Sequence, residues 1–93
     1  MIKKLLDDCK KWSYLEIQYS IGNHTAITIS QSEILEAALR GDMLDLDTYS
    51  GRLSVNTRDI SLQRSETTQY ITYSILSGEC SISIKVFKEG IKW

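Results

Sequence analysis

The sequence predicts a two-layer α+β fold, in which two helices cover one face of a mainly antiparallel sheet. Residues 2–12 repeat apolar side chains at helical spacing, whereas most of the chain after residue 14 alternates apolar and polar residues. Short turn-forming segments separate the alternating stretches, which favours hairpins. We therefore expect about six to seven short strands in the order α-β-β-α-β-β-β-β, within a single domain spanning residues 1–93.

The composition is that of an ordinary globular chain. Hydrophobic residues make up 42% of its 93 residues and charged residues 25%, and the net charge is −1. No stretch reaches the roughly 18 apolar residues that cross a bilayer, and the N-terminal segment lacks the apolar core of a signal peptide. We expect a cytoplasmic protein with no membrane association.

The first predicted helix spans residues 2–12. Its apolar side chains fall on one stripe: Ile2, Leu5, Leu6, Cys9 and Trp12. The lysines together with Asp7 and Asp8 fall on the opposite side, so this pattern predicts that both aspartates face solvent.

The first predicted hairpin joins strand 14–21 to strand 25–29. A three-residue loop, Gly22 to His24, would place the large apolar residues on one face, whereas a two-residue loop would put part of them on the polar face. The predicted partners are Ile21 with Thr25, Tyr19 with Ile27 and Ile17 with Ile29.

A second helix is predicted from Ser30 to Arg40. Ser30 and Glu33 have the spacing of a capping box, and Gly41 suits the left-handed residue that ends a helix. The apolar residues at helical spacing are Ile34, Leu35, Ala38 and Leu39.

Alternating strands fill the rest of the chain. One hairpin places Asp47 opposite Arg52, as an ion pair, and a short strand lies near Ile60 and Leu62. The last hairpin turns at Gly78-Glu79 and ends in a Tyr70–Phe87 pair. The predicted apolar partners are Leu44 with Val55, Leu46 with Leu53, Ile71 with Val86, Tyr73 with Ile84 and Ile75 with Ile82.

No set of residues forms a recognisable catalytic, cofactor or metal site. His24 is the one histidine, and it is far in sequence from Cys9 and Cys80, so neither a nucleophile with its base nor a zinc site is indicated. The glycines are isolated, and the segment 45–56 departs from a calcium loop. We expect two free thiols, no cofactor and no enzymatic activity.

The hypothesis about function rests on how charges are distributed along the sequence. Residues 12–84 hold nine acidic residues against four arginines, although the chain as a whole is nearly neutral. A small domain with no chemistry of its own is expected to act through its surface. We expect a protein-binding module, for example an inhibitor or immunity-type protein, that meets a basic partner through Asp42, Asp45, Asp47, Tyr49 and Arg52.

Two alternatives remain open at this stage. A self-associating structural protein would form a homodimer through its edge strands. A nucleic-acid accessory protein would use the basic and aromatic C-terminal residues, but the acidic body makes this a weaker hypothesis. Those residues are Lys85, Phe87, Lys88, Lys92 and Trp93.

Overall fold

The computed structural model describes residues 2–12 and 14–88. Within them the chain forms one helix and seven strands. Their bounds are α1 (Ile2–Trp12), β1 (Tyr14–Ile21), β2 (His24–Arg40), β3 (Met43–Thr48), β4 (Gly51–Asn56), β5 (Ser61–Glu66), β6 (Tyr70–Ser77) and β7 (Cys80–Phe87). The strands form one antiparallel sheet in the order β4-β3-β2-β1-β7-β6-β5. Among the described elements, α+β class and antiparallel pairing are confirmed.

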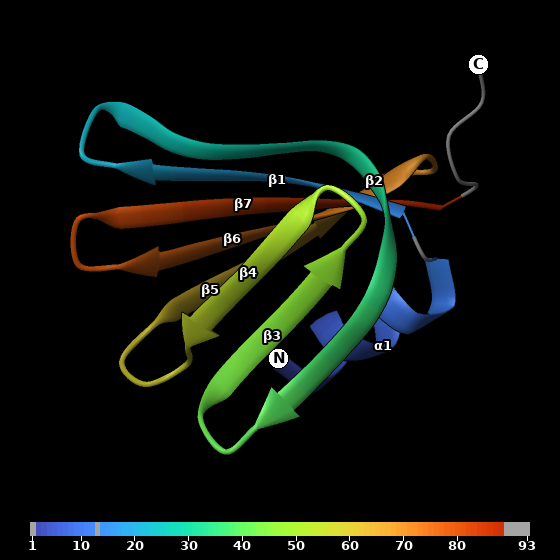
Figure 1. Cartoon of the computed structure of the whole chain (residues 1–93), viewed down its shortest axis with the longest axis horizontal. Coiled ribbons are helices and arrows are strands. Elements are labelled where there is room, and N and C mark those ends of the chain that lie inside the picture. Colours follow the sequence, from blue (N-terminus) through green and yellow to red (C-terminus); the bar gives the residue numbers. More distant parts are fainter. Residues whose placement is uncertain (1, 13, 89–93) are drawn as a thin grey trace.

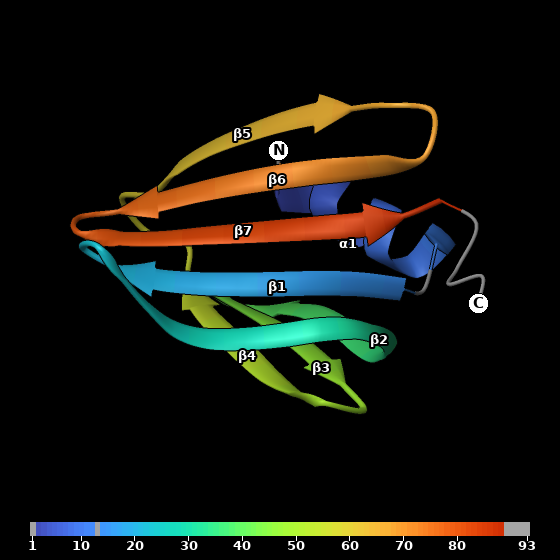
Figure 2. The ribbon, with the colours of Figure 1, turned by 90° about the horizontal axis from the view of Figure 1, so that it is seen from above.

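The sheet folds over on itself to make two layers. The larger layer contains β5, β6, β7, β1 and the first part of β2, and β3 and β4 cross over it at an angle (Figure 1). α1 lies beside this crossing hairpin, against the same face of the larger layer (Figure 2). The opposite face of the larger layer is left without a covering helix in these ranges.

The bend in β2 creates the second layer. Residues 24–33 pair with β1, and residues 34–40 pair with β3 on the other side of the strand. Three register shifts interrupt these pairings, and at each one β2 advances one residue further than its partner. Such bulges bend a strand and increase its twist. Two of them, near Ser30 and at Leu35, flank the point where β2 changes partner.

The predicted second helix, Ser30 to Arg40, is wrong, because this whole segment belongs to strand β2. Its Leu, Glu and Ala residues have good helix propensity, but propensity is worth only tenths of a kcal/mol per residue. Pairing with β1 and then with β3 provides backbone hydrogen bonds along one edge of each part of the segment and outweighs that preference. Gly41 does adopt a positive φ of 62°, but in the turn to β3 rather than at a helix end.

The predicted hairpins agree with the structure more closely than the predicted second helix does. Every predicted apolar pair of the β3–β4 and β6–β7 hairpins is confirmed, as is the T-shaped contact of Tyr70 with Phe87, whose ring centroids lie 6.4 Å apart. In the first hairpin the predicted three-residue loop is wrong: Ile21 pairs with His24 across a two-residue turn. A bulge then restores the predicted pairs of Tyr19 with Ile27 and Ile17 with Ile29.

One cluster of buried side chains joins the two layers and α1. Alternate residues of β1, β6 and β7 supply one wall and the β3–β4 hairpin the other; Ile29 and Ala37 of β2 and Leu5 and Cys9 of α1 complete the cluster. The start of β4 lies very close to β2: a Cβ atom placed on Gly51 would be 3.3 Å from Cδ1 of Ile29. The lack of a side chain at Gly51 thus lets the second layer close tightly on the first.

Asp8 departs from the predicted pattern, since it is buried with only 4% of its surface exposed. Tyr73 donates its hydroxyl hydrogen to the Asp8 carboxylate, and Nε of Arg64 lies 3.2 Å from the same oxygen. Burial, and then the bond to Asp8, raise the pKa of Tyr73. Because Arg64 belongs to β5 and Tyr73 to β6, their bonds to Asp8 connect α1 to both strands. Arg64 also bonds Glu66 of β5 at 2.8 Å.

We predict that Tyr73→Phe lowers the free energy of unfolding by about 1–2 kcal/mol, because the buried Asp8 carboxylate loses one of its donors. Urea denaturation of both proteins measures the difference. Tyr70→Phe is the matched control, since its ring lies on the outer face and its hydroxyl bonds no other described group. Equal losses in the two variants would contradict a stabilising role for the Asp8 network.

Candidate functional site

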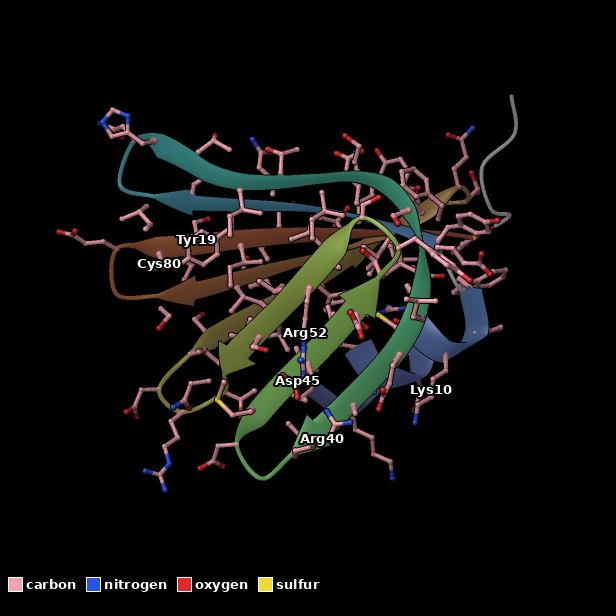
Figure 3. The ribbon with its side chains drawn as sticks, in the orientation of Figure 1. Lys10, Tyr19, Arg40, Asp45, Arg52 and Cys80 are labelled. Carbon is pink, nitrogen blue, oxygen red and sulfur yellow. The ribbon has the colours of Figure 1, made fainter. Side chains whose placement is uncertain are left out.

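The predicted acidic surface lies on the outer face of the β3–β4 hairpin. Leu44, Leu46 and Leu53 point into the core, so the intervening Asp45 and Arg52 point outward. Figure 3 shows these two side chains meeting Arg40 of β2 on the same face. Asp42 lies in the β2–β3 turn and Tyr49 in the β3–β4 turn, so the five predicted residues lie on β3, on β4 and in the turns at the two ends of β3.

Arginines compensate most of the acids on this face. Asp45 accepts hydrogen bonds from Ser54 at 2.6 Å and from Arg40 at 2.8 Å, and Arg52 lies 3.6 Å away. These partners, Ser54 first, lower the pKa of Asp45. Arg58 binds Asp42 at 2.7 Å in the same manner. The surface is therefore mixed in charge rather than uniformly acidic.

The predicted ion pair of Asp47 with Arg52 is wrong, because Arg52 pairs with Asp45 instead. The two residues are opposite each other in the sheet, as predicted, but the Arg52 guanidinium lies toward Asp45. Tyr49 is 71% exposed, and its backbone is held by a bond to the Glu33 carbonyl at 3.3 Å. It is an exposed aromatic residue at the tip of the hairpin.

The basic residues near the C-terminal end already have partners within the chain. Lys85 lies 4.6 Å from the centre of the Tyr70 ring, and Lys88 forms an ion pair with Glu66. Lys92 and Trp93, which the nucleic-acid hypothesis also uses, lie outside the described residues. What the structure describes of this region does not form a basic stripe.

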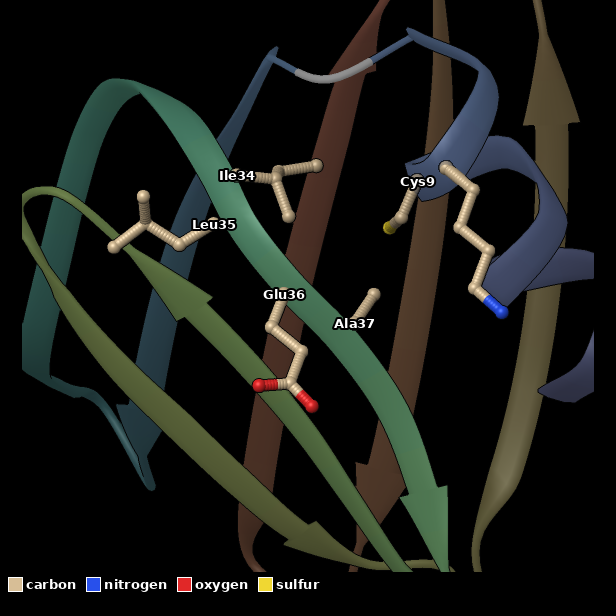
Figure 4. Close-up of a pocket in the computed structure, with 6 residues that line it drawn as sticks. Cys9, Ile34, Leu35, Glu36 and Ala37 are labelled. Atoms are coloured by element: carbon tan, nitrogen blue, oxygen red, sulfur yellow. The ribbon is translucent and has the colours of Figure 1, made fainter.

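A cleft of about 340 Å³ lies between α1 and the second part of β2 (Figure 4). Cys9 and Lys10 contribute from α1, and four consecutive residues, Ile34 to Ala37, contribute from β2. Cys9 and Ala37 are buried and form its inner part, while Leu35 is 52% exposed at its rim. Lys10 and Glu36 add one charge of each sign.

The cleft borders an unpaired strand edge. Residues 34–40 bond to β3 along one side, and the pairing with β1 has ended at Glu33, so the other side has no strand partner among the described residues. Backbone groups alternate in direction along a strand, so every second residue here directs its N–H and C=O away from β3. Unpaired backbone donors and acceptors thus lie beside apolar side chains.

Neither cysteine makes this cleft a nucleophilic site. Burial, and then the charge of Asp8, raise the pKa of Cys9 to about 12, so its thiol stays protonated at neutral pH. Both cysteines are free, as expected, and Cys80 lies far from the cleft near Tyr19 (Figure 3). In residues 2–12 and 14–88, no three His, Cys, Asp or Glu residues are grouped as metal ligands.

The cleft does not follow from the predicted fold, because residues 30–40 were expected to form a helix rather than a strand with a free edge. A signal for the strand was present: with a turn at Gly41-Asp42, Leu39 falls opposite Leu44 and Ala37 opposite Leu46. This is the same pairing test that identified the other hairpins. It locates the β2–β3 hairpin, but not the end of pairing with β1.

We predict that acid destabilises this protein through Asp45. Because its pKa is lower in the folded state than its ordinary value of 3.8, its stabilising contribution is present above that pH and is lost as pH falls through the folded value. Urea midpoints between about pH 5 and pH 2 should fall less steeply for Asp45→Asn than for the natural protein. Asp7→Asn, on the exposed side of α1, should follow the natural protein.

We also predict that the two thiols differ in reactivity. In the native protein at pH 8, iodoacetamide should modify the half-buried Cys80 at least about a hundredfold faster than Cys9, because Cys9 is inaccessible and holds its proton. Peptide mass spectrometry over time measures both rates. In urea the rates should converge, and similar rates without urea would refute the burial of Cys9.

Comparisons with known proteins support the fold alone. No protein-family model matches the sequence, and no curated protein matches it. The crystal structure of the YojF protein of Bacillus subtilis is similar in fold, with a TM-score of 0.63. The match covers 100% of this chain and 94% of that one, at 11% sequence identity. No helix among the described residues is long and apolar enough to span a membrane.

Proposed function

We propose that this chain is a non-enzymatic module that binds another protein, and that the partner adds an extended segment to the unpaired edge of β2. One observation carries the proposal: among the described residues, no strand pairs with the edge of residues 34–40 that faces away from β3, and this edge borders the cleft next to α1. An inhibitor or immunity-type protein is the kind of module that would work in this way.

Strand addition suits this edge for physical reasons. Main-chain hydrogen bonds to a sheet edge provide affinity, and pockets for alternate side chains provide specificity. Here the edge supplies the backbone groups, and the cleft supplies a pocket of mixed polarity that Cys9 and Ala37 close on its inner side. The cleft of about 340 Å³ is at the small end of ligand pockets, which fits one or two inserted side chains.

The outer face of β3–β4 serves this proposal as a rim. It shares β2 with the cleft, and Arg40 and Glu36 of that strand belong to its charge network. Exposed charges at an interface rim affect association rate and partner choice more than affinity. In this arrangement Asp45, Arg52 and Tyr49 select the partner while the β2 edge holds it.

Self-association is the second candidate. β4 and β5 are the outermost strands of the sheet, and each has a second edge with no partner among the described residues. Exposed edges can pair with a second copy of the same chain. Sedimentation of the purified protein separates the candidates, because a stable homodimer without other proteins favours self-association.

The protein-binding proposal predicts that Leu35→Lys weakens partner binding. Leu35 lies at the rim of the cleft, so a lysine there would place a charge where an apolar segment packs. Partners captured from native lysate by the tagged protein would be identified, purified and titrated against each variant. Binding should weaken at least about tenfold for Leu35→Lys.

Leu76→Lys is the matched control for this experiment. Leu76 is 51% exposed, nearly the same as Leu35 at 52%, but it lies on β6 away from the cleft. A partner whose binding is unchanged by Leu35→Lys, or is lost equally in both variants, would count against the cleft as the binding site. Circular dichroism checks that both variants are folded.

A further inference from the structure

We infer that the segment received at the β2 edge is acidic, with carboxylates directed toward α1 and apolar side chains directed into the cleft. This inference rests on the proposed function and adds the chemistry of the partner. It depends on how charges are distributed on the two walls of the cleft.

Helix α1, which forms one wall of the cleft, carries an excess of positive charge on its exposed surface. Lys3, Lys4, Lys10 and Lys11 are all exposed on this helix. Of its two acids, Asp8 is buried and bound by Arg64 and Tyr73, which leaves Asp7 as the one exposed acid among residues 2–12. The solvent-facing charge of the helix is therefore clearly positive, although the whole protein carries −1.

These lysines differ from the arginines of the β3–β4 face. Arg40 and Arg58 are each bound to carboxylates at 2.7–2.8 Å. Within residues 2–12 and 14–88, by contrast, no lysine of α1 forms an ion pair; Lys11 instead lies 4.9 Å from the centre of the Trp12 ring. Lys10 lines the cleft itself, and Lys3 lies two turns earlier on the same side of the helix.

The β2 wall offers no competing attraction for a basic segment. Its only acid at the cleft, Glu36, is engaged by Arg40 at 2.7 Å. The other residues of that wall, Ile34, Leu35 and Ala37, are apolar. An extended segment alternates its side chains between two sides, so apolar residues can enter the cleft while the intervening acids face Lys10.

Designed peptides test this inference before any natural partner has been identified. Three blocked eight-residue peptides would alternate valine with glutamate, glutamine or lysine, and each would be titrated into the ¹⁵N-labelled protein at low salt. The glutamate peptide should shift the amide signals of residues 34–40 and bind at least fivefold more tightly than the lysine peptide. Added salt should reduce this preference, because screening weakens exposed charge pairs.

Charge reversal at the cleft gives the sharper comparison. Lys10→Glu should reverse the preference between the glutamate and lysine peptides, whereas Lys85→Glu, on the outer face of the larger layer, should leave it unchanged. Equal affinity of all three peptides with shifts at residues 34–40 would overturn the acidic preference and keep the strand-addition site.

Two further outcomes are informative. Shifts confined to other strands would overturn the inference, and the Leu35→Lys capture experiment then decides separately whether a natural partner uses the cleft. Concentration-dependent shifts at residues 34–40 without any peptide would assign this edge to a second copy of the chain and would also overturn the inference.

Discussion

The fold depends on the way β2 divides its backbone hydrogen bonds between two neighbours. Its first part bonds to β1, and its second part bonds to β3 from the opposite side. Because β1 and β3 occupy different sides, part of each edge of β2 has no strand partner among the described residues. The bulges near Ser30 and Leu35 turn the strand at this point, so the following hairpin crosses the larger layer and closes the core.

The position of α1 follows from the same bend. The crossing hairpin covers only part of the inner face, and α1 fills the space beside it with Leu5 and Cys9. Asp8 is buried in doing so, and the cost of burying its carboxylate is offset by Tyr73 and Arg64. The cleft is the space left between this helix and the unpaired part of β2 (Figure 4).

The charges of the molecule are organised around these elements. On the β3–β4 face, Arg40 binds Asp45 and Arg58 binds Asp42, so these two acids stabilise the local structure and contribute less net charge than their number suggests. The lysines of α1 form no such pairs among the described residues, and one of them reaches the cleft. A count of charges along the sequence does not distinguish these two situations, because it contains no information on which charges meet.

α1 and the registers of the β3–β4 and β6–β7 hairpins follow from local sequence patterns, because helical spacing and alternation are local and a two-residue turn sets the partners. The strand state of residues 30–40 was decided only by tertiary structure. The local signals of Ser30, Glu33 and Gly41 agree with a helix, and pairing with two strands outweighs them. The burial of Asp8 and the cleft likewise depend on contacts between distant segments, since Arg64, Tyr73 and β2 are far from α1 in the sequence and meet it only in the folded structure.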